Sequence, residues 1–485
     1  MSHFRILDAQ GHLPLPELLR LLTPTPFFIP DPNFTFAFLL SARIFVSPLE
    51  IMQKVFEESF LSHGFLQMLD LSFELLSTPA LPPITHFRPP VSLQPSGATP
   101  NLVAFLSDWV ELFPYDFREE PMMENLKSIT KQCVARYEAH KKDVSPILQK
   151  LLDKLSSLEK HEEYIKEINK SSKPKTWSEH PPNRDIISVC PSPLDLAQQL
   201  TLVELRRLVY VGPEEIVYCL WRDPTISLPK ALEKELAIAH ANIRMANLEF
   251  YVDWFNRLSY LVASEICQYQ RKRHRAKAIE YWIQVARECF NLGNFNSLMA
   301  ILSGLSLGPV SRLKKTWTRV HNTQLSVLEH QMSPDSNFAS YRSTLAAAKW
   351  RRSGAENGKV VADEQQERRK IIIPVFSVLI KDLQHTFQGC CHRLECGDFD
   401  FRSFSAMSEV VKELTDWQKV KCPFVEKEEV TTYLIHSPVF TETGLTLASF
   451  SCELPETEAD KTRFKTLKSK MNAPNVDVTP TPALK

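Results

Sequence analysis

Glycine is scarce in this chain: only 12 of its 485 residues are glycine, whereas 34 are proline. Glycine adopts positive φ most readily, and both tight hairpin turns and glycine-rich phosphate-binding loops depend on such residues. Proline instead fits the first turn of a helix and the loops that join helices. The composition therefore disfavours hairpin-rich β folds and favours helices joined by proline-containing loops.

The overall composition is that of a globular protein. Apolar residues make up 44% of the chain and charged residues 24%, which is ordinary for soluble domains. The 57 Lys and Arg residues equal the 57 Asp and Glu residues, so no bulk charge indicates a nucleic-acid partner. The length predicts two to three domains that fold without a disulfide or metal.

The N-terminal residues lack the features of a secretory signal. Residues 1–20 contain no basic segment followed by a continuous apolar stretch, and no apolar run approaches the ~18 residues of a membrane span. The ten cysteines include no Cys-x-x-Cys pair, which is typical of reduced thiols. We therefore expect a cytoplasmic protein with no transmembrane segment.

Helix-capping signals recur along the chain. Residues 47–50 and 192–195 each place Ser before Pro, with an acidic residue three positions after the Ser, which predicts a helix start. Residues 201–204 (TLVE) predict a third start. Residues 102–109 carry Leu, Phe, Leu and Trp at helical spacing. Gly293 follows another such stripe and predicts a helix end.

Two apolar stripes in the C-terminal half predict a helical hairpin. The first begins at Pro374 and ends at Gly389, and a short loop would join it to an antiparallel partner. The polar residues 353–370 contain two glycines and predict a flexible insert before the hairpin. The partner stripe consists of four apolar residues at helical spacing, Phe404, Met407, Val411 and Leu414.

Two motifs suggest covalent or metal chemistry, but neither has the expected context. Residues 304–308 match the Gly-x-Ser-x-Gly elbow of hydrolases, which requires a strand before the serine. The preceding residues have helical spacing instead, so hydrolysis through Ser306 is a minor alternative. A second group of residues could donate metal ligands but lacks the two ligand pairs of an ordinary zinc site. These residues are His385, Cys390, Cys391, His392 and Cys396.

The densest basic run is Arg271–Lys277, which reads RKRHRAK. It lies between two amphipathic stretches and lacks the interleaved aromatic residues that stack on bases. We predict a solvated loop between helices, with contact to an anionic membrane surface as the alternative. The chain also contains no Gly-x-Gly-x-x-Gly or Walker-type loop, so it does not cradle a nucleotide by itself.

Several runs of residues occur in the order found in the catalytic domain of Ras-type guanine-nucleotide exchange factors. The segment 105–117 (FLSDWVELFPYDF) also resembles the exchanger motif that accompanies this domain. The chain therefore resembles the Ras-GEF domain-containing family, in particular its member-one subfamily, over roughly residues 12–470. The runs are 193–201 (PLDLAQQLT), 294–298 (NFNSL), 309–313 (PVSRL), 328–330 (LEH) and 373–376 (IPVF).

The resemblance implies an all-α fold of two domains. Residues 27–165 would form an N-terminal helical Ras exchanger motif (REM) domain with a proline-rich loop at 78–100. A linker at 166–184 would lead to the larger all-helical catalytic domain at 185–455, from which the helical hairpin protrudes. Residues 456–485 would form a C-terminal tail that is disordered at its end.

The resemblance also implies an activity. The chain would release GDP from a Ras-superfamily GTPase, with a Rap-type GTPase favoured, by inserting the hairpin beside the magnesium and phosphate site. No covalent chemistry is involved, so the resemblance implies no catalytic nucleophile, no metal and no cofactor. The protein would be cytoplasmic and recruited to the cytosolic face of membranes. The alternative is an exchange-deficient relative that binds the GTPase as a scaffold.

Eight positions are implied as GTPase contacts. The family's usual Phe and Glu are replaced by Val375 and Gln388, and the second change removes a carboxylate that could occupy the anion site of the phosphate loop. For the aromatic positions, packing in the core is the alternative role. The eight residues are Asn294, Asn296, Phe338, Tyr341, Val375, Phe376, Gln384 and Gln388.

Overall fold

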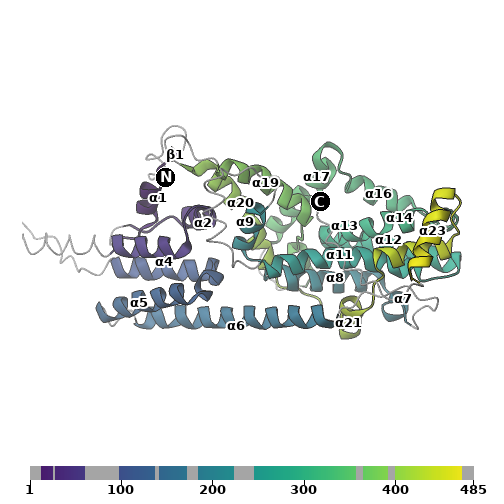
Figure 1. The fold of residues 1–485 in the computed structure, drawn as a ribbon. Helices are drawn as coiled ribbons and strands as arrows, with labels where there is room; N and C mark the ends of the chain where they lie inside the picture. Colours follow the sequence, from purple (N-terminus) through teal and green to yellow (C-terminus); the bar gives the residue numbers. More distant parts are fainter. Residues whose placement is uncertain are drawn as a thin grey trace, which may run out of the picture. The chain divides into compact units, whose positions relative to one another are not determined.

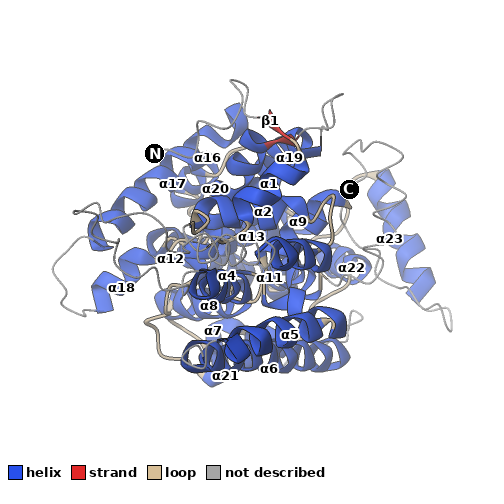
Figure 2. Cartoon of the chain, turned by 90° about the vertical axis from the view of Figure 1, so that its left-hand side faces the viewer, coloured by secondary structure: helices blue, strands red, loops and turns tan. Residues whose placement is uncertain are grey.

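The computed structural model describes residues 12–25, 28–59, 98–136, 141–171, 184–222, 245–356, 364–391 and 399–471 (Figure 1). Helices dominate these residues, as Figure 2 shows. Two short strands, β1 (His12–Leu13) and β2 (Phe399–Asp400), pair antiparallel with His12 opposite Asp400. The all-α prediction is confirmed. None of the described helices is long and apolar enough to cross a membrane.

The chain folds into two compact units, each built from segments that are distant in the sequence. Unit 1 comprises residues 1–161, 212–245 and 380–415, and unit 2 comprises 162–211, 246–379 and 416–485. The labelled helices within unit 1 are α1 (Leu15–Leu22), α2 (Pro32–Ala42), α4 (Ala98–Leu112), η2 (Pro114–Arg118), α5 (Glu120–Arg136) and α9 (Pro213–Trp221), and residues 48–59 of this unit are also helical. Three helices continue from one unit into the other, α6 (Lys141–Ser171), α19 (Phe376–Cys391) and α20 (Phe401–Gln418).

Unit 2 consists of the remaining helices. They are α7 (Ile186–Val189), α8 (Pro193–Leu208), α11 (Ala246–Cys267), α12 (Lys272–Leu292), α13 (Phe295–Ser306), α14 (Gly308–Ser311), α15 (Lys314–Trp317), α16 (Thr323–Gln331), α17 (Asp335–Glu356), α18 (Glu364–Lys370), α21 (Glu428–His436), α22 (Glu442–Cys452) and α23 (Glu458–Met471). The centre of this unit is formed by α8, α11, α12 and α13, which pack against one another.

Aromatic contacts hold the C-terminal part of unit 1 to its N-terminal part. The ring centroids of Phe34 and Phe401 lie 4.8 Å apart, and those of Phe45 and Phe399 also lie 4.8 Å apart. Phe45 stacks on Phe404 with centroids 6.3 Å apart. The residues of the predicted second hairpin helix therefore share a core with residues 34–45.

Most helix-capping predictions are confirmed. The Ser47 hydroxyl accepts a hydrogen bond from the Glu50 amide at 3.2 Å, and Ser192 caps α8 through the Asp195 amide at 3.3 Å. Gly293 ends α12 with φ 80°, a conformation that favours glycine. The apolar residues of 102–109 are buried in α4, as expected.

The helix start predicted at residues 201–204 is wrong, because α8 continues through it. The Thr201 hydroxyl donates to the Ala197 carbonyl at 2.8 Å, a bond typical of a threonine inside a helix. Glu204 is completely buried rather than placed in a solvated first turn. Tertiary packing of α8 therefore overrides the local capping signal.

The hairpin helix α19 does not end at Gly389 but continues to Cys391. The insert predicted at residues 353–370 is largely helical, because α17 runs to Glu356 and α18 spans Glu364–Lys370; residues 357–363 lie outside the described part. A single glycine weakens a helix by only about 1 kcal/mol, so surrounding contacts can override it.

The proposed domain boundaries stay a prediction. Helix α6 crosses residue 165 and makes the start of the predicted linker helical, whereas residues 172–183 lie outside the described part. Helix α4 begins inside the proline-rich loop predicted at 78–100, of which residues up to 97 are not described. Helix α23 lies in the predicted C-terminal tail.

Candidate functional site

A buried polar network in unit 2 lies beneath the first residues of α19. Its centre is Glu204, whose Oε1 accepts hydrogen bonds from Ser297 Oγ at 2.9 Å and Asn296 Nδ2 at 3.2 Å. Burial raises the pKa of Glu204, while hydrogen bonds from Ser297, Tyr251 and Asn296 oppose that shift. A buried carboxylate needs such partners, because an unpaired one is strongly destabilising.

Asn296 connects this network to α19. Its Oδ1 accepts a hydrogen bond from the backbone N–H of Phe376 at 3.2 Å, while its Nδ2 faces Glu204 and the Tyr251 hydroxyl. The first N–H groups of a helix have no partner within the helix. Asn296 therefore satisfies one of them and fixes where α19 begins.

Asn294 organises the neighbouring turn. It is the N-cap of α13: its Oδ1 accepts from the Ser297 amide at 3.0 Å, and its Nδ2 donates to Thr201 Oγ1 at 3.2 Å. On either side of Asn294, Ile373 exchanges backbone hydrogen bonds of 2.9 Å with Gly293 and Phe295. The turn thus holds the segment that leads into α19.

Tyr341 fixes a second N–H group at the start of α19. Its hydroxyl accepts from the Val375 amide at 2.9 Å, and its ring meets that of Phe295 edge to face at 5.8 Å. Tyr341 and Val375 are only 2% and 1% exposed. Both side chains therefore support the hairpin from inside the core.

A rare backbone conformation precedes Tyr341 on α17. Ser336, Asn337 and Phe338 have φ values of 51°, 56° and 59°, in the left-handed region, although none is glycine. Each such residue costs roughly 1–2 kcal/mol, and strain of this kind is common at active sites, ligand-binding sites and switch segments. In this left-handed turn, Phe338 is half-buried and lies at the surface of unit 2.

Helix α19 has one exposed stripe. Lys381, His385 and Gln388 are exposed, and Gln384 is half-buried beside them, while Leu383 and Phe387 on the opposite side are fully buried. Residues three and four positions apart share one helix face. The stripe is therefore a continuous surface along the helix.

The structure thus divides the eight predicted contact residues into two groups. Phe338, Gln384 and Gln388 have surface available to a partner. The other five are buried and support the start of α19, so their direct contact with a GTPase stays a prediction; they are Asn294, Asn296, Tyr341, Val375 and Phe376. Sequence reasoning missed Glu204, Tyr251 and Thr201, which complete the network. A charged residue among apolar neighbours at helical spacing was the available signal for Glu204.

The alternative chemistries gain no support from the geometry. Ser306 ends a helix rather than following a strand, and its exposed hydroxyl donates to the Ser303 carbonyl at 2.9 Å. Among the described residues, no group of three or more His, Cys, Asp or Glu could hold a metal ion. Four of the residues considered as metal ligands, Cys390, Cys391, His392 and Cys396, have side chains outside that part of the chain.

We expect Asn294→Ala to lower the free energy of unfolding by about 1–3 kcal/mol, because it leaves the buried Ser297 amide without a partner and removes the hydrogen bond to Thr201 Oγ1. Chemical denaturation measures this loss, and the exchange assay should be run on the same preparation. Asn322→Ala is a matched control: Asn322 is also an N-cap, but it is exposed and makes no side-chain capping bond. Equal stability of the two variants would contradict the assigned role.

Comparison with known proteins identifies the family. The sequence model of the RasGEF domain matches residues 195–420. Ras-GEF domain-containing family member 1B from Homo sapiens is 41% identical over 463 residues, covering 94% of this chain and 90% of that protein. Member 1C from Homo sapiens is 39% identical over 469 residues, covering 96% and 92%. These matches confirm the resemblance seen in the sequence, and the chain belongs to the Ras-GEF domain-containing family.

Proposed function

We propose that this protein is a guanine-nucleotide exchange factor that stimulates GDP release from a Ras-superfamily GTPase. Membership of the family supports this class of activity. The resemblance to the member-one subfamily favours a Rap-type GTPase as the substrate. The activity would take place in the cytoplasm, at the cytosolic face of membranes when the protein is recruited there.

The proposed mechanism is displacement by the exposed stripe of α19. The GTPase holds its nucleotide through a phosphate loop, a lysine and magnesium. Insertion of α19 beside that site would move one switch segment and disrupt the magnesium and phosphate contacts. No covalent bond forms or breaks, so the mechanism requires no nucleophile in this chain.

The observation that carries this proposal is the fixed start of α19. The side chains of Tyr341 and Asn296 hold two consecutive backbone N–H groups, those of Val375 and Phe376, and both side chains lie in the core. A displacing element must be rigid, because a flexible one would lose its binding energy to ordering. We infer that the network around Glu204 maintains this rigidity.

A GTPase-binding scaffold that exchanges poorly is the second candidate, and Gln388 is the observation that favours it. An amide offers a carbonyl oxygen but no net charge, so it pairs less strongly than a carboxylate with a phosphate-loop lysine. Binding to the GTPase would persist, because the proposed contacts of Phe338 and Gln384 do not depend on a charge at position 388.

Release of fluorescent GDP from a panel of Ras and Rap GTPases tests the proposal, with a pull-down of the same GTPases beside it. We expect the full chain to accelerate release from at least one of them. Binding without acceleration would support the scaffold instead. If the chain neither binds these GTPases nor accelerates GDP release, the exchange-factor proposal and the scaffold proposal are both contradicted.

A further inference from the structure

The basic run at residues 271–277 is not the loop that the sequence predicted, because α12 begins at Lys272 within it. One of its cations, Arg275, is buried: its guanidinium pairs with the Glu453 carboxylate at 3.5 Å, and its Nε donates to Thr316 Oγ1 at 3.0 Å. The other cations of the run are exposed. Arg275 therefore stabilises the fold, and the rest of the run needs another explanation.

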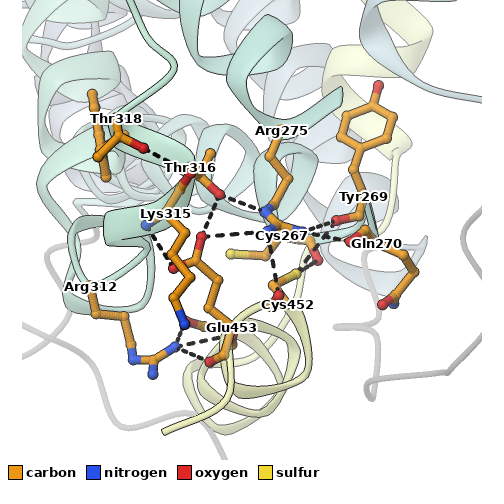
Figure 3. A network of polar contacts seen from close by, with 12 residues as sticks. Cys267, Tyr269, Gln270, Arg275, Arg312, Lys315, Thr316, Thr318, Cys452 and Glu453 are labelled. Carbon is orange, nitrogen blue, oxygen red and sulfur yellow. Dashed lines mark hydrogen bonds and ion pairs between the residues drawn. The ribbon is translucent and has the colours of Figure 1, made fainter. Parts of the chain in front are cut away.

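Glu453 brings three segments of unit 2 together, as Figure 3 shows. Besides Arg275, its carboxylate accepts hydrogen bonds from Thr316 Oγ1 at 2.6 Å and from the Lys315 amide at 3.0 Å. Its backbone carbonyl accepts from Arg312 Nη1 at 2.8 Å. Residues 275, 312–316 and 453, which belong to the segments 269–277, 312–319 and 453–471, consequently meet within unit 2.

These three segments concentrate positive charge in a chain whose net charge is zero. They contain fourteen Lys and Arg residues but only four Asp and Glu residues. Glu453 is engaged by the fold, Glu456 pairs with Lys315, and Glu458 pairs with Lys461. The fourth acidic residue is Asp460, which is half-buried on α23. Nine exposed cations form no ion pair within the described residues, and we call them the basic surface: Arg271, Lys272, Arg273, Lys277, Lys314, Arg319, Arg463, Lys465 and Lys468.

No ion pair among the described residues accounts for the nine cations of the basic surface. Helix α12 begins with Lys272 and Arg273 and has neither an acidic residue in its first turn nor a side-chain cap. Cations at that position are opposed by the helix dipole. Unpaired like charges near one another also destabilise a folded protein. Such charge is therefore expected to serve a partner.

We propose that the basic surface docks on an anionic phospholipid membrane. Charge complementarity supports a polyanionic partner, and Leu454, which is 73% exposed beside Glu453, supplies an apolar side chain that can enter the headgroup region. A single-stranded nucleic acid fits less well, because proteins bind single strands largely by stacking exposed aromatic rings on the bases. Tyr269 and Trp317 are instead half-buried, and their polar atoms bond to Asp185 and the Val310 carbonyl.

Co-sedimentation of the full chain with vesicles tests this proposal. We expect binding to vesicles that contain about 30 mol% phosphatidylserine, weakening as salt is raised, and no binding to phosphatidylcholine alone. The triple variant R273Q/K277Q/K465Q should bind at least tenfold more weakly, because each cation near an anionic surface contributes roughly fivefold. Denaturation of the variant should match that of the unmodified chain.

A second triple variant controls for net charge. K166Q/K170Q/K421Q removes three exposed cations of unit 2 that lie outside the basic surface, and it should retain most of the binding. Equal losses in the two variants, or equal binding to both kinds of vesicle, would overturn the proposal. Binding to a single-stranded RNA without binding to vesicles would overturn it in favour of a nucleic acid. Because no GTPase is present, these outcomes are independent of exchange activity.

Discussion

A fragment of residues 183–460 is expected to melt at a lower temperature than the full chain and to release GDP at least tenfold more slowly. The fragment keeps Phe399, Phe401 and Phe404 but loses residues 34–45, against which these rings pack. Complete burial of one such side chain contributes ~1.5–3 kcal/mol. Exposing all three therefore lowers the free energy of unfolding by at most about 9 kcal/mol.

Thermal denaturation and GDP release, measured on the same samples, test this prediction. A fragment of residues 12–471 is the matched control, because it removes only terminal residues outside the described part and keeps the aromatic pairs of the described residues of unit 1. If the 183–460 fragment has the melting temperature and exchange rate of the control, residues 12–161 do not support α20.

The second large effect is expected at Gln388. The variant Gln388→Glu should accelerate GDP release by roughly 10- to 100-fold, because one charge-assisted hydrogen bond contributes about 1.5–3 kcal/mol. Gln388 is exposed on α19, where a carboxylate could pair with the lysine and amides of an emptied phosphate loop. The variant Gln388→Ala should lower release only slightly, since it removes a neutral contact.

Stopped-flow release of fluorescent GDP at saturating exchange factor measures both variants. Gln324→Glu is a matched control, because Gln324 is an exposed glutamine on α16 and the substitution changes the net charge equally. The alternative is that Gln388 lies in the last turns of α19 without meeting the GTPase. A Gln388→Glu protein that releases GDP no faster than the Gln324→Glu control would support that alternative.

The sequence predicted features that depend on local interactions. Helix starts at Ser47 and Ser192 and the helix end at Gly293 are determined by residues within one turn, and all three are confirmed. The apolar stripe of the second hairpin helix is likewise buried as predicted, and its members are Phe404, Met407, Val411 and Leu414.

Features that depend on distant residues could not be predicted in this way. Glu204 looked like a capping residue because its partners, Asn296 and Ser297, lie more than ninety positions away. Arg275 looked solvated because its partner Glu453 is even more remote in the sequence. The left-handed turn at residues 336–338 carries no glycine to signal it. Long-range burial, rather than local preference, decided each of these positions.

The measurement that tests the central claim most directly is the affinity of the full chain for one GTPase in its nucleotide-free and GDP-bound forms. Linkage requires that an exchange factor that weakens GDP binding prefers the nucleotide-free form by the same factor. We predict a preference of at least about 100-fold for the nucleotide-free form. Equal affinity for the two forms would contradict the account, because a partner without a preference cannot promote release of the nucleotide.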